Sequence, residues 1–361
     1  MSKALFISNR FGDKYTGASV VSKLNYEYMK HFFGESNVSI FCLSNVDTNV
    51  IMKFLKVIFL KRIDGMTIKK ERLVMNLIEK QNFNFVFFDG SLHGLLVKKI
   101  KKKFPDIKII IFFHDVCYDW IRSLTSSKKI SSYNALVKPV TVNERIAARF
   151  SDARIFLSEK DELRCSNLYG KKKSTILPVA IIDKLRDCTS INGKYLLFVG
   201  ANYKPNIEGI KWYINNVYKH SKLGLHVVGK NLEAYREFFE ENNVKLINNA
   251  SDDALEWEYL NACYVISPIF LGGGMKVKIA EAMMYGKIIL GTSQSFIGYE
   301  KTVDTYVCNE IDDFVKYTKF LNKLFYEEDN YFSVHNREVF ERYHCVSRNK
   351  EKFKDYINEV E

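Results

Sequence analysis

The sequence has few of the residues that build long linkers or covalent cross-links. Only five prolines occur in 361 residues, and no stretch is rich in glycine and serine, so any linker is expected to be short. The seven cysteines are scattered, odd in number and include no C-x-x-C pair. This argues against a disulfide framework or a zinc site and predicts a reducing compartment.

The chain also lacks the long apolar segments that enter membranes. No uncharged apolar run reaches about 18 residues, the length that predicts a membrane span. The first residues lead directly into a predicted strand, without the basic and apolar regions of a signal peptide. We therefore expect a cytoplasmic protein.

Apolar runs alternate with amphipathic segments along most of the chain, which predicts an α/β protein. Strands are expected over residues 4–8, 38–43, 83–89, 108–114, 153–158, 175–179, 194–200, 225–229, 244–247, 263–268 and 287–292. Helices are expected over residues 17–33, 91–104, 131–150, 159–169 and 205–218, and the tail from about 310 is predicted to be helical. This alternation predicts parallel sheets covered on both faces.

Length and charge both divide the chain in two. A chain of 361 residues with 47% hydrophobic residues suggests two domains. Residues 1–190 hold 33 Lys and Arg against 18 Asp and Glu, whereas residues 191–361 hold 21 against 24. A polar linker is predicted at residues 186–194, between two Rossmann-like domains at 1–187 and 188–345. The basic first half implies an anionic partner: nucleic acid, a membrane surface or a phosphorylated substrate.

The most informative motif is FLGGGMKVKIAEAMMYG at residues 270–286. Gly272, Gly273 and Gly274, here called the glycine loop, let the backbone approach a ligand closely. The predicted helix after them points its positive end at that ligand. Lys276 and Lys278 add positive charge. A tight strand-to-helix turn with solvated lysines is the simpler interpretation. The position at the carboxyl end of a late strand favours a diphosphate site.

Two features of the first half are expected at the same kind of sheet edge. Gly17 and Ala18 open the helix after the first strand, where backbone passes close to a ligand. His114 and Asp115 end the strand IIIFFHD. A histidine there can hydrogen-bond a ligand, although His114 or Asp115 can equally cap the next helix.

With these motifs the chain resembles GT-B glycosyltransferases, close to the retaining family 4 (glycosyl transferases group 1). LLFVG and YVISPIFLGGGMKVKIAEAMMYGKIILGT carry most of the resemblance, and NERIAARFSDARIFLSEKDE and TGASVVSKL carry less. The resemblance implies two Rossmann-like domains facing a cleft, the first on the acceptor side and the second binding a nucleotide-sugar. It also implies that a C-terminal helix, residues 346–361, returns toward the first domain.

The resemblance assigns roles to individual residues. Gly273 and Gly274 would donate backbone hydrogen bonds to the diphosphate, Lys278 would offset charge on the leaving phosphate, and Glu281 would accept from the ribose diol. His114 would lie beside the reacting sugar, so His114 and Lys278 are the predicted catalytic residues. The predicted donor-binding residues are Gly17, Lys204, Gly273, Gly274, Met275, Lys276, Lys278 and Glu281.

The sequence also departs from the family pattern. The family has two glutamates eight positions apart, and Gly273 occupies the first position here. Ala201 stands where the family tends to have an arginine, with only Lys204 nearby. Lys276 and Lys278 are interpreted as compensating charges.

The expected function is transfer of a sugar from a nucleotide-sugar to a saccharide or lipid-linked acceptor, in surface polysaccharide or glycoconjugate synthesis. No cofactor or metal is expected, because glycine-loop amides, a helix N-terminus and lysines can stabilise the leaving diphosphate. The basic first domain predicts peripheral binding to the inner face of the membrane, with VIMKFLKVIFLKR (50–62) and VKKIKKKF (97–104) as candidate contacts. Alternatives are a sugar-nucleotide epimerase, a non-catalytic sugar-nucleotide-binding or scaffold protein, and a nucleic-acid-binding protein. The last lacks any recognisable nucleic-acid-binding motif.

Overall fold

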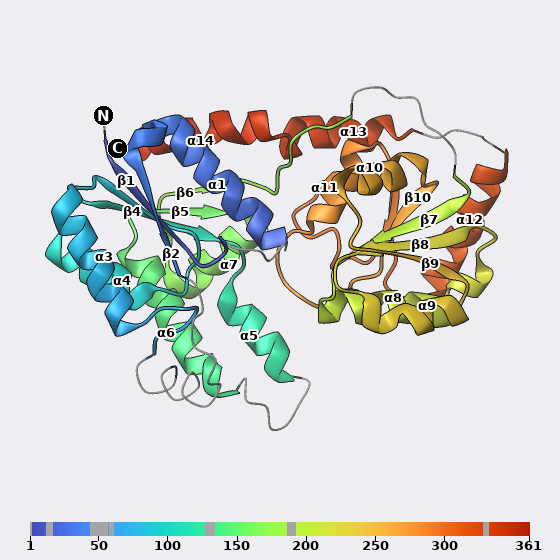
Figure 1. Cartoon of the computed structure of the whole chain (residues 1–361), viewed down its shortest axis with the longest axis horizontal. Helices are drawn as coiled ribbons and strands as arrows, with labels where there is room; N and C mark the ends of the chain where they lie inside the picture. Colours follow the sequence, from blue (N-terminus) through green and yellow to red (C-terminus); the bar gives the residue numbers. More distant parts are fainter. Residues whose placement is uncertain are drawn as a thin grey trace. The chain divides into compact units, whose positions relative to one another are not determined.

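The chain folds into two compact α/β units, which Figure 1 shows coloured along the sequence. The computed structural model describes residues 2–11, 17–43, 57, 61–126, 134–185, 193–327 and 332–361. The first unit comprises Met1–Pro178 and Asn349–Glu361, and the second comprises Val179–Arg348. Each unit contains one six-stranded parallel sheet covered by helices on both faces.

In the first unit the strand order is β2-β1-β3-β4-β5-β6. The strands are β1 (Ala4–Ser8), β2 (Val38–Cys42), β3 (Phe85–Phe88), β4 (Lys108–Phe113), β5 (Ala153–Phe156) and β6 (Ser174–Ile176). The helices are α1 (Gly17–Phe33), α3 (Ile68–Gln81), α4 (Gly94–Lys103), α5 (Cys117–Ser126), α6 (Asn134–Phe150), α7 (Glu159–Tyr169) and α14 (Val346–Val360). The chain places β2 on one side of β1 and β3 on the other, so the strand order reverses between β1 and β3.

Alternation along the strands of the first unit separates two packing faces. Phe6 and Phe87 stack at 5.2 Å between ring centroids, and Phe87 contacts Phe353 of α14 at 6.3 Å. On the other face the strands pack against α3, α4 and α6, as the buried cluster shows: Leu5, Ile7, Val86, Phe88, Ile109, Ile111, Val74, Ile78, Leu96, Val97, Ile100 and Ala147. The aromatic and branched residues of these strands therefore form two cores, one on each side of the sheet.

The C-terminal helix α14 is part of the packing of the first unit. Its Phe353 lies 5.8 Å from the ring of Tyr28 on α1, and its Tyr356 hydroxyl donates to the carbonyl of Arg154 on β5 at 3.0 Å. Near the two chain ends, marked in Figure 1, the Ser2 hydroxyl donates to Glu361 at 2.7 Å. The last turns of the chain are thus held by residues from its first half.

In the second unit the strand order is β12-β11-β10-β7-β8-β9. The strands are β7 (Tyr195–Val199), β8 (Gly224–Gly229), β9 (Val244–Asn248), β10 (Tyr264–Ser267), β11 (Ile288–Gly291) and β12 (Thr305–Val307). The longer helices are α8 (Lys204–Asn216), α9 (Arg236–Glu241), α10 (Asp252–Asn261), α11 (Val277–Met284), α12 (Ile311–Glu327) and α13 (Val334–Val339), followed by a π-helical turn at Phe340–His344. Here the strand order reverses between β7 and β10.

One core of the second unit lies between its sheet and helices α8, α9 and α12. It contains Leu196, Phe198, Leu225, Val227, Tyr264, Ile266, Ile288, Leu290, Ile210, Tyr213, Phe239, Phe314 and Leu321. Gly209 of α8 lies so close to the loop after β10 that a Cβ added there would be 2.0 Å from the Pro268 carbonyl oxygen. The absence of a side chain at Gly209 therefore sets how near α8 approaches the segment leading into the glycine loop.

The predicted strands are present, but several end earlier than expected. Asp89, His114 and Ser158 were predicted as strand residues, yet β3, β4 and β5 end before them. These polar side chains take other partners: Ser158 caps α7 by accepting from the backbone N–H of Asp161, and Asp89 contacts Ser8 and His114. The predicted helix at 91–104 begins only at Gly94. The sequence analysis did not predict α3, α5, α9, α10 or β12, and most of the 50–62 segment lies outside the described residues.

Candidate functional site

The glycine loop of the second unit lies where its strand order reverses. It follows β10, and the segment after the neighbouring strand β7 leads into α8. A Cβ added to Gly272 would lie 3.9 Å from Pro205 Cγ in the first turn of α8, so the two segments are adjacent. Parallel α/β sheets bind ligands at the carboxyl ends of the strands beside such a reversal.

The backbone conformation of the glycine loop requires glycine at two of its three positions. Gly272 has φ 101° and Gly274 has φ 67°, which residues with a Cβ rarely adopt, whereas Gly273 has no such requirement. The Lys276 ammonium donates to the carbonyls of Gly273 and Gly274 at 2.7 and 2.6 Å. The Tyr299 hydroxyl donates to the Lys276 carbonyl at 2.8 Å. The loop is thus held by its own lysine and by a buried tyrosine.

Lys278 lies in the first turn of α11 and faces the start of α8. Its Nζ donates to Asn206 Oδ1 at 2.9 Å and lies 4.4 Å from the centre of the Phe198 ring. Burial, together with the nearby charge of Lys276, lowers the pKa of Lys278 to about 7. A ligand anion beside this ammonium would favour its charged form.

Glu281 lies just over one turn into α11. The Tyr259 hydroxyl donates to its Oε2 at 2.9 Å, and its neighbours Ile279, Ala280 and Ala282 are fully buried. Burial raises the pKa of Glu281, while the Tyr259 hydrogen bond and the charge of Lys278 act in the opposite direction. Lys278 and Glu281 therefore present a cation and a carboxylate within one helical turn.

Three other predicted donor-binding residues have different surroundings. Lys204, the first residue of α8, is exposed, with its Nζ 3.6 Å from Glu208. Met275 is buried, and its Sδ accepts from the backbone N–H of Val179 at 3.5 Å, so it anchors the segment after β6. Gly17 is the exposed first residue of α1 in the first unit, and residues 12–16 before it lie outside the described part of the chain.

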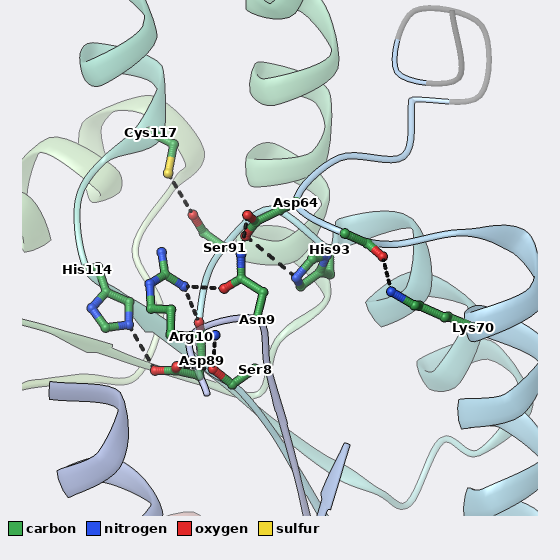
Figure 2. A network of polar contacts seen from close by, with 11 residues as sticks. Ser8, Asn9, Arg10, Asp64, Lys70, Asp89, Ser91, His93, His114 and Cys117 are labelled. Carbon is green, nitrogen blue, oxygen red and sulfur yellow. Dashed lines mark hydrogen bonds and ion pairs between the residues drawn. The ribbon is translucent and has the colours of Figure 1, made fainter. Parts of the chain in front are cut away.

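In the first unit a polar network surrounds Asp89, just after β3 (Figure 2). The Ser8 hydroxyl donates to Asp89 Oδ2 at 2.6 Å, and His114 Nε2 lies 2.9 Å from Oδ1. Asn25 of α1 donates to Oδ1 at 3.3 Å. Ser8 ends β1 and His114 follows β4, so three adjacent strands bring these side chains to one sheet edge.

Arg10 adds a positive charge to this network. Its guanidinium donates to the Asp89 carbonyl at 2.8 Å and to Asn9 Oδ1 at 3.0 Å, and Figure 2 shows it between His114 and His93. Asn9 also contacts Asp64, whose Oδ2 is 3.9 Å from His93 Nε2. Burial and the charge of Arg10 lower the pKa of His114, which favours a neutral imidazole.

A second buried carboxylate, Glu144 of α6, caps helix α5. Its oxygens accept from the backbone N–H groups of Cys117 and Tyr118 at 2.7 and 2.9 Å, and from the Ser91 hydroxyl at 3.0 Å. The sequence analysis left open that His114 or Asp115 caps this helix. Glu144 provides these contacts, and the His114 imidazole contacts Asp89 instead.

Sequence reasoning missed Asp89, Arg10, Asn206 and Tyr259. Asp89 directly follows β3, and Arg10 lies two residues after β1. A polar residue just after a buried strand is the same signal that marked His114, and it applied equally to these two residues. No local pattern marks Asn206 or Tyr259, because their contacts with α11 join residues 72 and 22 positions apart.

Comparison with known proteins finds a family match within the second unit. Residues 193–321 match the family model described as glycosyl transferases group 1. This segment is therefore similar to glycosyl transferases group 1 domains. It contains the glycine loop, Lys278 and Glu281. A curated relative, an uncharacterized protein in the cps region of Klebsiella pneumoniae, is 30% identical over 120 residues, which is 30% of this chain and 30% of that protein's length.

Similar solved structures extend over nearly the whole chain. Sucrose-phosphate synthase from Thermosynechococcus elongatus has a TM-score of 0.70 at 11% identity and 99% coverage of both chains. HepE from Anabaena in complex with UDP-glucose has a TM-score of 0.68 at 8% identity, again covering 99% of both. The lipopolysaccharide outer core galactosyltransferase WaaB has a TM-score of 0.63 at 15% identity and covers 99% of this chain and 98% of its own. The fold is therefore GT-B, with two Rossmann-like domains, as predicted.

The described residues offer neither a metal-binding cluster nor a membrane-spanning helix. No group of three or more His, Cys, Asp and Glu side chains in this part of the chain is arranged to hold a metal ion. None of the helices that the structure describes is long and apolar enough to span a bilayer.

Proposed function

We propose that this protein is a glycosyltransferase that moves a sugar from a nucleotide-sugar to a saccharide or lipid-linked acceptor. The observation that carries the proposal is the pair Lys278 and Glu281 on α11, directly after the glycine loop and inside the matched domain. A cation suits the departing diphosphate, and a carboxylate suits the two ribose hydroxyls. HepE, a structure of the same fold, is in complex with UDP-glucose, which supports a nucleotide-sugar as donor.

The proposed chemistry places negative charge on the diphosphate as the glycosidic bond to it breaks. The N-terminal end of α11, the glycine-loop amides and Lys278 lie where they can stabilise that charge. The proposal therefore includes transfer without a bound metal. It also includes retention of the anomeric configuration, which rests on the resemblance to family 4, and a place in surface polysaccharide synthesis, which the curated relative's cps region supports.

One observation favours an alternative, a non-catalytic protein that binds a sugar nucleotide or organises a polysaccharide assembly complex. Gly273 stands where the family has its first glutamate, so the side chain that would reach the donor sugar is absent. Incubation of the purified protein with a panel of nucleotide-sugars and lipid-linked or free saccharide acceptors separates the two. Formation of a glycoside product supports the enzyme. Donor binding with neither a glycoside product nor donor hydrolysis supports the alternative.

Glu281→Ala should weaken nucleotide-sugar binding by about 1–3 kcal/mol, because the variant loses charged hydrogen bonds to the ribose. Calorimetry with the donor selected by the panel measures the change. Glu237→Ala, which removes an exposed acid from α9, is the control and should bind like the original protein. Equal affinities for both variants would mean that the ribose binds elsewhere.

The proposal extends to reversible attachment to the inner face of the cell membrane through the basic first unit. Several lysines of α4 are already paired: Lys101 with Asp152 at 2.8 Å and Lys103 with Glu79 at 2.9 Å. Lys102 in the last turn of α4 and Lys171 and Lys172 before β6 are exposed, and the charge of Lys101 acts on Lys172. We call these three exposed lysines the basic surface. Such residues each contribute about 1 kcal/mol near an anionic bilayer.

Co-sedimentation with phosphatidylserine-containing vesicles should show binding at low salt that is lost at high salt. Reversing two charges of the basic surface, Lys102→Glu with Lys171→Glu, should reduce binding at least about tenfold. The control carries two reversals in the second unit, Lys219→Glu with Lys222→Glu, and should bind as before. Binding that is absent at low salt, or indifferent to lipid charge, would indicate a soluble acceptor instead.

A further inference from the structure

The environment of His114 restricts which of its two ring nitrogens carries a proton. Nε2 lies 2.9 Å from Oδ1 of Asp89, whose side chain is completely buried. Among the residues that the structure describes, Asp89 is the only hydrogen-bond partner of the imidazole. An ionised carboxylate can only accept, so Nε2 must donate. A neutral imidazole with a proton on Nε2 has an unprotonated Nδ1.

Two features keep the pair in this state. Asp89 also accepts from Ser8 at 2.6 Å and from Asn25 at 3.3 Å, and the Arg10 guanidinium lies against its backbone carbonyl, so its carboxylate is held ionised. The charged groups that act on His114 are Arg10, Asp89 and Asp64. Burial of the imidazole, whose ring centroid lies 4.8 Å from that of Phe112, lowers the pKa of His114 and disfavours an imidazolium.

We infer that Asp89 is a positioning residue: it holds His114 in the Nε2–H tautomer, so that Nδ1 accepts a hydrogen bond from a sugar hydroxyl at the transfer step. This inference rests on the proposed glycosyltransferase function for its ligand, but not for the tautomer. A hydroxyl is the matching ligand because it can donate to a neutral nitrogen, whereas a phosphate or carboxylate oxygen cannot. Nδ1 therefore matches a sugar hydroxyl and offers no hydrogen bond to an ionised phosphate oxygen.

The orientation of the imidazole is set by elements far apart in the chain. Ser8 is 81 residues from Asp89, and His114 is 25 residues from it, yet β1, β3 and β4 are adjacent strands in register. Asp89 itself is too deeply buried to contact a substrate directly. Its effect on transfer must therefore pass through His114, and this gives the inference a distinct signature.

Nitrogen-15 NMR of protein labelled at histidine tests the tautomer without any substrate. The protein has seven histidines, and loss of a signal pair in His114→Gln assigns the resonances of His114. We expect a protonated Nε2 and an unprotonated Nδ1. In Asp89→Asn the amide can donate to Nε2, so the Nδ1–H tautomer should become populated. Glu144→Gln, which alters another buried carboxylate of the first unit, should leave the His114 signals unchanged. A protonated Nδ1 in the original protein, or unchanged signals in Asp89→Asn, would overturn the inference.

Kinetics with the donor and acceptor selected by the turnover panel test the second part. Asp89→Asn should lower kcat about 10–100-fold, by analogy with the loss of a carboxylate that orients a metal-binding histidine, with little change in donor KM. In the His114→Gln background the same substitution should have no further effect on kcat. Thermal melting is measured on all three variants, so that a loss of stability is separated from a loss of rate. Additive losses in the double variant would overturn the positioning role.

The two proposals fail in different ways. If no nucleotide-sugar is turned over by the original protein, the proposed function fails and the hydroxyl contact fails with it, while the NMR result still decides the tautomer. If transfer is observed but Asp89→Asn has the original kcat, the enzyme stands and the positioning role of Asp89 is wrong.

Discussion

Replacing Lys278 with methionine should lower kcat/KM for sugar transfer by about 10²–10³-fold, the usual loss for one group that stabilises transition-state charge. The Lys278 ammonium lies in the first turn of α11, beside the glycine loop, and its nearest partners are the neutral Asn206 and the Phe198 ring. Methionine keeps most of the apolar side chain but cannot offset charge on a departing diphosphate. Steady-state kinetics with the selected donor measures the change.

Lys211→Met is the matched control for this variant. Lys211 is also half-buried, and its Nζ lies 4.6 Å from the Phe238 ring centre, much as Lys278 lies over Phe198. It is on α8, and its ammonium lies over the rings of Tyr235 and Phe238, so its loss should leave kcat/KM unchanged. Equal losses in the two variants would point to a general effect on folding and against a role for Lys278 in transfer.

The pH dependence of donor binding gives a second readout of the same residue. The pKa of Lys278 is lowered to about 7 by burial and Lys276, and a bound diphosphate favours the charged form. Donor affinity should therefore be highest below pH 7 and fall as the pH rises and the free protein loses this proton. A fall of roughly tenfold or more between about pH 6 and pH 8.5 is expected. In Lys278→Met this decline should disappear.

Gly209→Ala should destabilise the second unit by about 1–3 kcal/mol or more, although alanine ordinarily stabilises a helix interior relative to glycine. The added Cβ would lie 2.0 Å from the Pro268 carbonyl oxygen, a backbone atom that cannot move aside without displacing the loop after β10. Urea unfolding of the full chain measures the loss. Because Pro268 leads into the glycine loop, donor affinity should fall as well.

Gly224→Ala provides the comparison for this substitution. Gly224 begins β8, and a Cβ there would meet its nearest atoms at 3.7 Å, an ordinary contact distance. We expect its unfolding midpoint to stay close to that of the original protein. An unchanged midpoint for Gly209→Ala would show that α8 can shift away from Pro268 at little cost, contrary to close packing at this point.

Several features of the fold follow from local sequence pattern. Runs such as FVFF and KIIIFF alternate with amphipathic helices, and fully apolar strands require helices on both sides, so parallel sheets were predictable. Strand ends were less so, because Asp89 and His114 directly follow apolar runs, and whether such a residue still pairs in the sheet depends on the neighbouring strands. Helix α3 was missed because its apolar positions are interrupted by many charged residues, and only packing on the sheet makes Val74 and Ile78 a buried face.

The candidate site divides in the same way. The sequence by itself determined the glycine loop, the helix after it, and the presence of Lys278 and Glu281 on that helix, because these depend on residues close together in the chain. Only the tertiary structure decided that Asn206 accepts a hydrogen bond from Lys278 and that Tyr259 donates to Glu281. It also decided that Asp89 forms hydrogen bonds with Ser8 and His114. Those contacts depend on β7 lying beside β10 and β1 beside β3. The alternation of strands and helices leaves strand order open, because the same apolar strands can pair in more than one sequence of neighbours.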